Sequence, residues 1–333
     1  MGEWDEMLPK MQVSVTERCQ MKCIYCTGWK KAMRSFNGEK TELPTETMME
    51  IIRCGVEAGL KDVHFTGGEP FLREDLADIV RMTTEMGARV EVNTNGLLIT
   101  SESILKLKDA GCKLLKISLD TPGRKEFERI QGIDAYEKIV SGIKIAKEIL
   151  PVRVNCVVMR SNLQMIYPLI KLMDKIGAPR VHLLDLTYYA FSGGNLFWRN
   201  EFVPLLKVVK PLLEEKTGSR FSSLPIYGCS FNELRFGNTG VVIKEANPTM
   251  RGPHCADCLS YCHEGIFSLR LSAAGYLNAC PSVNNIGVDA IAALRCGKLP
   301  SEYQRFSKIF DEAKLVESFP IFLEKNRINF CDQ

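Results

Sequence analysis

The 333-residue sequence lacks the long apolar segments that a membrane protein or a secreted precursor needs. No run of about 18 apolar residues occurs, so we expect no transmembrane helix. The first ten residues, MGEWDEMLPK, do not form the apolar stretch of a signal peptide. These absences favour a cytoplasmic protein with no membrane partner.

The sequence also lacks a strong net charge. Its 43 basic and 40 acidic residues give a net charge of +3. A balance this even creates no strong electrostatic field, and we therefore expect no nucleic-acid polymer as a partner. A hydrophobic content of 45% and a charged content of 25% are ordinary for a globular protein. The length allows one large α/β domain, alone or with an appended region.

Cysteine, by contrast, is abundant, with thirteen residues. In a reducing cytoplasm such residues are metal ligands, catalytic groups or small core residues more often than disulfides. Six are scattered, and we interpret them as small buried side chains. The other seven form two groups: Cys19, Cys23 and Cys26, and then Cys255, Cys258, Cys262 and Cys280.

Short apolar runs alternate with helical patterns through the first 190 residues. The pattern predicts strands at 12–16, 62–66, 89–94, 114–119, 152–159 and 180–186. It predicts helices around 45–58, 73–86, 101–109, 135–149 and 163–176, the first of them capped by Thr45. This alternation is typical of a parallel sheet. Six units are too few for a closed eight-fold barrel, so the sequence predicts an α/β fold with a partial (β/α)6 TIM barrel. Chemistry is then expected at the C-terminal ends of the strands.

The rhythm changes after about residue 190. We expect a loop at 190–198, a helix at 202–216, short strands between 228 and 285, and two or three closing helices. The segment FSLRLSAAGYLNAC predicts a hairpin that turns at Ala274-Gly275. We therefore divide the chain into a barrel at 1–200 and a C-terminal region at 201–333.

The first cysteine group, C-x3-C-x2-C, directly follows a predicted strand. Cysteine thiolates bind iron–sulfur clusters, normally one thiolate to each iron, so three thiolates leave one iron of a cubane open to another ligand. A zinc site would need a fourth Cys or His, and no histidine is closer in sequence than His64. A redox C-x-x-C pair would use Cys23 and Cys26 and leave Cys19 unexplained. The pattern favours a [4Fe–4S] cluster.

The sequence resembles the radical S-adenosylmethionine (radical SAM) superfamily in this loop and at the following strand ends. Tyr25 stands just before the last cysteine, as in the family. The other matching stretches are FTGGEPFLREDL at 65–76, NTNG at 93–96, SLD at 118–120 and VNCVVMR at 154–160. The resemblance implies that SAM contacts lie at these strand ends, at Tyr25, Thr66, Gly67, Gly68, Glu69, Thr94, Asn95, Ser118, Asp120 and Met159.

The resemblance also implies the chemistry. In this family SAM binds the open iron, and reductive cleavage yields methionine and a 5′-deoxyadenosyl radical that abstracts hydrogen from the substrate. The protein supplies placement and electrostatics for this cofactor chemistry. An external one-electron reductant of the flavodoxin or ferredoxin type is therefore implied as a partner, together with a small-molecule substrate.

The second cysteine group has the pattern C-x2-C-x3-C, and Cys280 follows after seventeen intervening residues. Four thiols around a hairpin are typical either of an all-thiolate zinc site or of a second [4Fe–4S] cluster. In a chain that carries one iron–sulfur motif, the auxiliary [4Fe–4S] cluster is the favoured interpretation. Cys262 is either a fourth ligand or a bystander.

Nearly the whole chain resembles the molybdenum-cofactor GTP 3′,8-cyclases (MoaA) and their relatives, which carry an auxiliary cluster of the SPASM or twitch type. VTERC, TGGEPFLRED, CADC, LRLSAAGYLNAC and KNRIN carry this resemblance. The chain departs from it in its extra cysteine, Cys262, in Ser268 and Arg270 where the cyclases have two arginines, and in its final residues FCDQ.

The resemblance implies a small polar substrate, for example a nucleoside, nucleotide or nucleotide-sugar in a biosynthetic pathway. Candidate substrate contacts are Arg18, His64, Arg153 and Arg270. Three alternatives remain open: GTP 3′,8-cyclisation itself, modification of a peptide, and a non-enzymatic metal-binding scaffold. The scaffold leaves TGGEP, NTNG and SLD unexplained.

Overall fold

The chain is built around one curved sheet, seen in a computed structural model that describes residues 10–26, 42–187, 195–226, 229–245, 249–256, 258, 266, 268–280 and 286–317. Within these residues the sheet has twelve strands in the order β13-β12-β11-β1-β2-β3-β4-β5-β6-β9-β8-β7. Its centre is a parallel run of six consecutive strands: β1 (Met11–Thr16), β2 (Asp62–Gly67), β3 (Arg89–Thr94), β4 (Leu114–Ser118), β5 (Val152–Val157) and β6 (Arg180–Leu184). This run confirms the predicted parallel sheet and its six strands. The sheet curves as an open, partial barrel.

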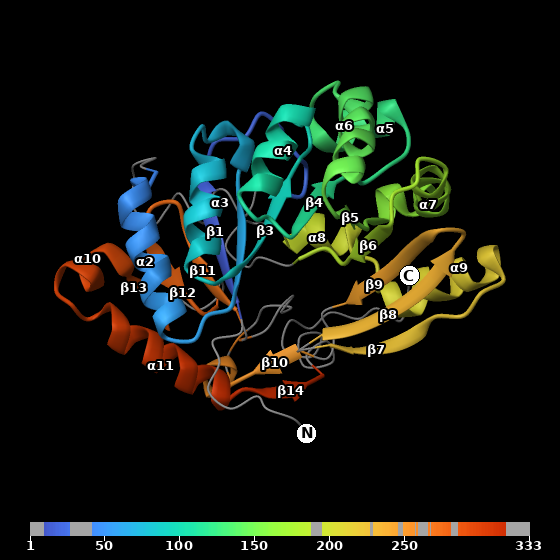
Figure 1. Cartoon of the computed structure of the whole chain (residues 1–333). Coiled ribbons are helices and arrows are strands. Elements are labelled where there is room, and N and C mark those ends of the chain that lie inside the picture. The colour runs from blue at the N-terminus through green and yellow to red at the C-terminus, as the bar shows by residue number, and fades with distance from the viewer. Residues whose placement is uncertain are drawn as a thin grey trace.

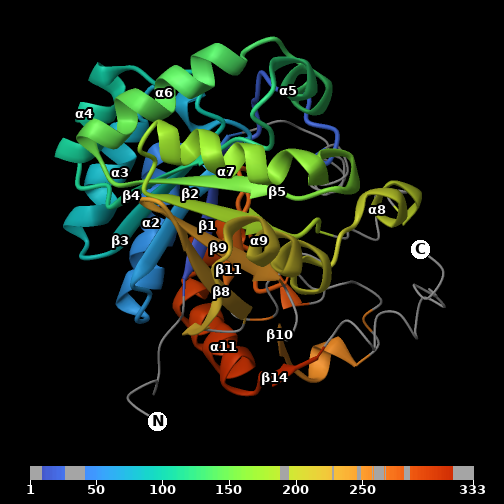
Figure 2. The same ribbon diagram turned by 90° about the vertical axis from the view of Figure 1, so that its right-hand side faces the viewer.

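Helices cover the convex face of this sheet, as Figures 1 and 2 show. They are α2 (Thr45–Glu57), α3 (Leu76–Glu85), α4 (Ser101–Asp109), α5 (Arg124–Gln131), α6 (Tyr136–Ile149) and α7 (Ile166–Lys175). Short 3-10 turns follow β2 (η1, Pro70–Leu72) and β5 (η2, Arg160–Met165). Alternate strand residues, among them Val13, Phe65, Val92, Ile117 and Val154, are fully buried in the core. Because side chains alternate along a strand, the intervening residues face the concave side.

Two helices and one cap differ from the sequence-based expectations. Helix α5 was not predicted, because RKEFERIQ is mostly charged and buries only Phe127, Ile130 and Gln131. Helix α8 (Asn195–Glu201) begins inside the segment 190–198, which was expected to be a loop, and extends three residues past its end. The prediction that Thr45 caps α2 was wrong. Pro44 occupies the N-cap position, while the Thr45 hydroxyl donates to Asp75 and accepts from Arg73.

The C-terminal region extends both edges of the same sheet. On one side β9 (Thr239–Glu245) pairs in parallel with β6 and continues into β8 (Cys229–Phe236) and β7 (Ser222–Ile226). On the other side β11 (Leu269–Leu271) pairs in parallel with β1 and antiparallel with β12 (Tyr276–Asn278), which confirms the predicted hairpin. Strand β13 (Val288–Asp289) completes this edge. The division of the chain at residue 200 stays a prediction.

The remaining elements pack around these edges. They are the π-turn η4 (Leu205–Val209), α9 (Lys210–Thr217), β10 (Thr249–Arg251), η5 (Pro253–Cys255), α10 (Ala290–Arg295), α11 (Leu299–Asp311) and β14 (Lys314–Val316). Strands β10 and β14 form a separate pair next to α11, on the side of the sheet away from helices α3 to α7 (Figure 1). No helix among the described residues has both the length and the apolar character of a membrane span.

Candidate active site

The first cysteine group lies on the loop that follows β1. Cys19, Cys23 and Cys26 are partly buried, and a backbone hydrogen bond of 3.0 Å from Cys26 N to Cys23 O folds the last two into one turn. Two further backbone bonds tie the loop to the end of α5. Lys22 N donates to Gln131 O and Ile24 N donates to Ile130 O, each at 2.9 Å. Three thiols are thus presented from one anchored loop at the C-terminal edge of the parallel strands.

A buried hydrogen-bond network connects this loop to β4 and β5. The Cys23 thiol donates to Gln131 Oε1, and Gln131 Nε2 donates to Asp120 Oδ2. The Tyr25 hydroxyl donates to the same carboxylate oxygen at 2.7 Å, and Val157 N donates to Asp120 Oδ1 at 2.7 Å. Burial raises the pKa of Asp120 to about 6, although these donors favour its charged form. Asp120, a predicted SAM contact, therefore orients the cysteine loop.

The Gly-Gly-Glu turn after β2 packs against the exit of β1. Gly68 N donates to Thr16 O and Glu69 N donates to Arg18 O, both at 2.7 Å. A Cβ atom on Gly68 would lie 2.1 Å from Arg18 O, and one on Gly67, whose φ is +129°, would lie 2.3 Å from Thr16 O. Only glycine permits this approach, which places the turn beside the start of the cysteine loop.

The Glu69 carboxylate is fully buried and binds three donors of the protein itself. Oε1 accepts from Thr94 Oγ1 at 2.7 Å and from Phe71 N at 3.1 Å, and Oε2 accepts from Asn95 N at 2.7 Å. Burial nevertheless raises the pKa of Glu69 to about 7. Glu69 thus joins the turn after β2 to the NTNG stretch at the end of β3. Asn95 also directs its Nδ2 at Cys19 Sγ, 3.8 Å away.

The other predicted SAM contacts lie at the strand ends with different exposure. Thr66 and Ser118 are partly exposed at the ends of β2 and β4. Met159 is fully buried in an apolar cluster with Ile130, Leu186, Trp198 and Phe202. Trp198 is 2% exposed, stacks on Phe202 and donates to Leu186 O, so it packs in a core.

One of the four predicted substrate contacts, Arg18, lies apart from the other three. Arg18 is at the rim, where its Nε lies 2.7 Å from Glu42 Oε1 and its side chain is 57% exposed. His64, Arg153 and Arg270 lie on the concave face of three different strands, β2, β5 and β11. Arg270 contacts Gln12 of β1 at 3.4 Å, and Gln12 stands in register with both Arg270 and His64.

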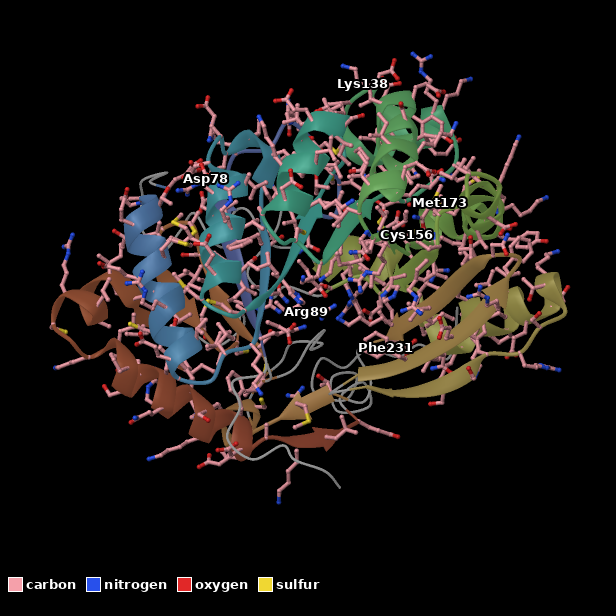
Figure 3. The ribbon with its side chains drawn as sticks, viewed as in Figure 1. Asp78, Arg89, Lys138, Cys156, Met173 and Phe231 are labelled. Atoms are coloured by element: carbon pink, nitrogen blue, oxygen red, sulfur yellow. The ribbon has the colours of Figure 1, made fainter. Side chains whose placement is uncertain are left out.

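A polar layer continues from His64 across the neighbouring strands. Glu91 Oε2 lies 3.2 Å from His64 Nε2 and 2.5 Å from Lys116 Nζ, and Arg153 is in register with Lys116. These residues come two positions before Thr66, Asn93, Ser118 and Asn155 on their strands, one layer deeper than the strand ends. Figure 3 shows Arg89, which pairs with Glu91, on the concave side, whereas Asp78 and Lys138 project from convex-side helices.

The charge of this layer is dominated by cations. Burial and the nearby Arg153 lower the pKa of Lys116 to about 7, and Lys116 keeps the pKa of Glu91 low despite its burial. Burial also lowers the pKa of Arg153 to about 10 and strongly lowers the pKa of His182, so that His182 is neutral. His182 Nε2 is buried and has no hydrogen-bond partner among the described residues. The layer is therefore suited to an anionic group.

Four residues of the site were not predicted from the sequence: Gln131, Glu91, Lys116 and His182. The last three carried a usable signal, because each interrupts an apolar strand at an alternate position: RVEVNT, LLKISL and RVHLLDL. Gln131 carried none, since only the folded contact with Cys23 reveals it.

Cys280 of the second cysteine group lies near the N-terminal ends of the parallel strands, whereas the first group follows the C-terminal end of β1. β12 runs antiparallel to β11, so Cys280 falls level with the start of β1, six residues or roughly 20 Å along the strand from its end. Cys258 N donates to Cys255 O at 3.1 Å, which places these two cysteines on one turn. Cys262 lies outside the described residues. The described residues contain no three Cys, His, Asp or Glu side chains arranged to hold a single metal ion.

Comparison with known proteins links these features to one group of enzymes. Residues 13–173 match the radical SAM superfamily. A probable GTP 3′,8-cyclase of Pyrococcus abyssi is 29% identical over 296 residues, covering 88% of this chain and 90% of the relative. One of Saccharolobus islandicus is 28% identical over 284 residues, covering 82% of each chain.

Solved structures share the fold at low sequence identity. Streptococcus suis SuiB bound to S-adenosylmethionine superposes with a TM-score of 0.61 at 15% identity, over 86% of this chain and 64% of SuiB. This chain thus spans less than two thirds of that protein. The AdoMet-bound structure of anSMEcpe gives a TM-score of 0.56 at 15% identity, over 90% of this chain and 82% of that one.

Proposed function

The chain belongs to the radical SAM superfamily, and on this premise we propose that it cleaves SAM reductively at a [4Fe–4S] cluster and abstracts hydrogen from a small, polar, anionic substrate. The single observation that carries the proposal is the anchored three-thiol loop beside the Gly-Gly-Glu turn, one layer above a cation-rich concave surface. An enzyme of this family needs such a juxtaposition of cluster, cofactor and substrate.

The residues present fit a three-thiolate cluster. Cys19, Cys23 and Cys26 supply one thiol for each of three irons, and the loop carrying them is fixed by backbone bonds to α5. The chemistry that the cluster supplies when bound is one-electron reduction of SAM, which yields methionine and a 5′-deoxyadenosyl radical. An external flavodoxin- or ferredoxin-type reductant would provide the electron.

The chain's own residues hold the reactants in place. Glu69 and the two glycines keep the turn after β2 against the cysteine loop, where partly exposed strand-end groups such as Thr66 and Ser118 would face SAM. Beneath them, Lys116 and Arg153 would bind an anionic group of the substrate. Hydrogen abstraction then requires the substrate carbon to lie between this layer and the strand ends.

The activity test is anaerobic reconstitution with iron and sulfide, followed by dithionite and SAM. We expect 5′-deoxyadenosine from the wild-type protein and none after replacement of Cys19, Cys23 and Cys26 by alanine. A folded, iron-loaded wild-type protein that forms no 5′-deoxyadenosine would refute the proposal.

A narrower candidate, GTP 3′,8-cyclisation, is favoured by the two relatives that align over most of this chain. The test supplies GTP with SAM and dithionite and looks for the 3′,8-cyclised product by mass spectrometry. Formation of 5′-deoxyadenosine without this product would leave the radical SAM proposal standing and direct the search to other nucleotides.

We further propose that Cys255, Cys258 and Cys280, with Cys262, bind an auxiliary [4Fe–4S] cluster. The proposal is supported by the turn that joins Cys255 and Cys258 and by the hairpin that leads to Cys280. Reconstituted protein should contain about eight irons, and the triple variant at Cys19, Cys23 and Cys26 about four. Zinc at the second site, with about four irons in the wild type, is the result that contradicts it.

A further inference from the structure

The side-chain amide of Gln131 touches the second cysteine of the loop from a fully enclosed position. Gln131 is 1% exposed, and its backbone carbonyl accepts from Lys22 N, the residue directly before Cys23. Its Oε1 accepts from the Cys23 thiol, and its Nε2 donates to Asp120. Gln131 is therefore fixed to the loop at both its backbone and its side chain.

Binding of iron reverses the hydrogen-bonding role of Cys23 toward Gln131. A thiol can donate a hydrogen bond, but an iron-bound thiolate can only accept one. Gln131 cannot leave, because its side chain is enclosed and its backbone is paired with the loop. Its two amide ends have nearly the same shape, so a half-turn of the carboxamide replaces Oε1 by Nε2 beside the sulfur.

The surroundings can accept the turned amide. The Tyr25 hydroxyl lies within hydrogen-bonding reach of both Asp120 and Gln131. It can therefore donate to Gln131 Oε1 in the turned position, while Val157 N keeps Asp120 Oδ1 in place. The half-turn also places Gln131 Oε1 beside Asp120 Oδ2, so in the turned arrangement Asp120 carries the proton between these two oxygens.

We propose that Gln131 is a positioning residue of the SAM-binding cluster, whose side-chain N–H donates to the Cys23 sulfur once Cys23 ligates iron. This inference rests on the proposed function, because it takes Cys23 as an iron ligand. A hydrogen bond to a cluster thiolate stabilises the extra negative charge of the reduced state. Gln131 thereby makes the cluster easier to reduce.

The test is a redox titration of anaerobically reconstituted full-length protein, read by electron paramagnetic resonance on the signal that changes when SAM is added. In Gln131→Met, which keeps the length but lacks the N–H, we expect about a tenfold lower ratio of reduced to oxidised cluster at fixed potential. For a one-electron couple this is a shift of about 59 mV to more negative potential. If this variant binds less iron, its reduction potential can still be measured, because only molecules with an assembled cluster give the signal.

A second variant separates this role from simple loosening of the loop. Asp120→Asn keeps the shape of the side chain and presents an amide N–H to Gln131 Oε1, which favours the turned carboxamide. We expect its potential to equal or exceed that of the wild type. Asn232→Leu, which removes a buried amide on β8, is the matched control and should keep the wild-type potential.

The outcomes are distinct. An unchanged potential in Gln131→Met overturns the inference, and so does an equal fall in Gln131→Met and Asp120→Asn, which would indicate general loosening. If the wild type assembles no cluster, or if SAM changes no signal, the proposed function fails instead.

Discussion

The Glu69 carboxylate and the Thr94 hydroxyl are joined by a buried hydrogen bond of 2.7 Å, which ties the turn after β2 to the end of β3. Asn95 N and Phe71 N complete the coordination of the same carboxylate. In Glu69→Gln an NH2 group replaces one of the two carboxylate oxygens and faces a hydrogen-bond donor of the protein. We expect a loss of roughly 1–3 kcal/mol in the free energy of unfolding, measured by urea denaturation. Glu102→Gln, at an exposed site, should cost less than about 0.5 kcal/mol.

The pH dependence of this effect has a definite sign. Burial raises the pKa of Glu69 from its usual 4.5 to about 7, so the folded state binds this proton more tightly than the unfolded chain does. Protonated Glu69 therefore stabilises the folded state fully below pH 4.5, the pKa in the unfolded chain. This stabilisation is lost as pH rises through about 7, the pKa in the folded protein. Wild-type protein should therefore lose stability relative to Glu69→Gln across this window. A constant difference between the two proteins would contradict the assignment.

The strands could be predicted from sequence because their pattern is local. Val13, Phe65 and Val92 are apolar at alternate positions, and each strand buries these residues against helices. Helix α5 could not be predicted in this way, since its stability comes from Phe127 and Ile130 packing in the core and not from its charged sequence.

In the candidate site, too, local motifs could be predicted from the sequence, whereas contacts between strands could not. The cysteines and the Gly-Gly-Glu turn are contiguous motifs, so the sequence alone identified them. The Lys116–Glu91 pair joins residues 25 positions apart on neighbouring strands, and its partner His64 comes from a third strand. Such a layer depends on strand register, which only the folded sheet defines.

Lys116 should make anion binding depend on pH. Its pKa is lowered to about 7, so its positive charge is present below this value and is lost above it. With GTP as the probe, we expect the affinity of the wild type to fall as pH rises through 7. Lys116→Met should bind more weakly at low pH and show little of this dependence.

Titration of the GTP phosphates changes the affinity of the wild type and of Lys116→Met equally, so it cancels when the two proteins are compared. Calorimetric titration at several pH values measures the difference directly. Parallel pH profiles for the wild type and Lys116→Met would show that Lys116 does not contact the anion.

Arg153 should contribute to the same binding surface at all accessible pH values. Its pKa of about 10 keeps it charged where Lys116 is neutral. Loss of a hydrogen bond to a charged group costs about 1.5–3 kcal/mol, so Arg153→Met should weaken GTP binding about 10- to 100-fold. Arg81→Met, on the convex-side helix α3, is the control and should bind GTP like the wild type. Equal GTP affinities for the wild type, Arg153→Met and Arg81→Met would show that the anion does not bind at Arg153.

Gly68 should be the least replaceable residue of the turn after β2, for a steric reason. A Cβ at this position would lie 2.1 Å from Arg18 O and 2.6 Å from Arg18 C, which are backbone atoms that cannot move without displacing the cysteine loop. We expect Gly68→Ala to lower the free energy of unfolding by more than about 3 kcal/mol and to reduce the iron bound after reconstitution.

Gly87→Ala provides the matched comparison for this substitution. Gly87 has a φ of +93° and no atom within 4 Å of the added Cβ, so only backbone strain opposes the change. It should cost about 1–2 kcal/mol and leave the bound iron at the wild-type level. Iron analysis and urea denaturation of the two variants separate the effects. Normal iron binding by Gly68→Ala would show that the close contact with Arg18 does not position the cysteine loop.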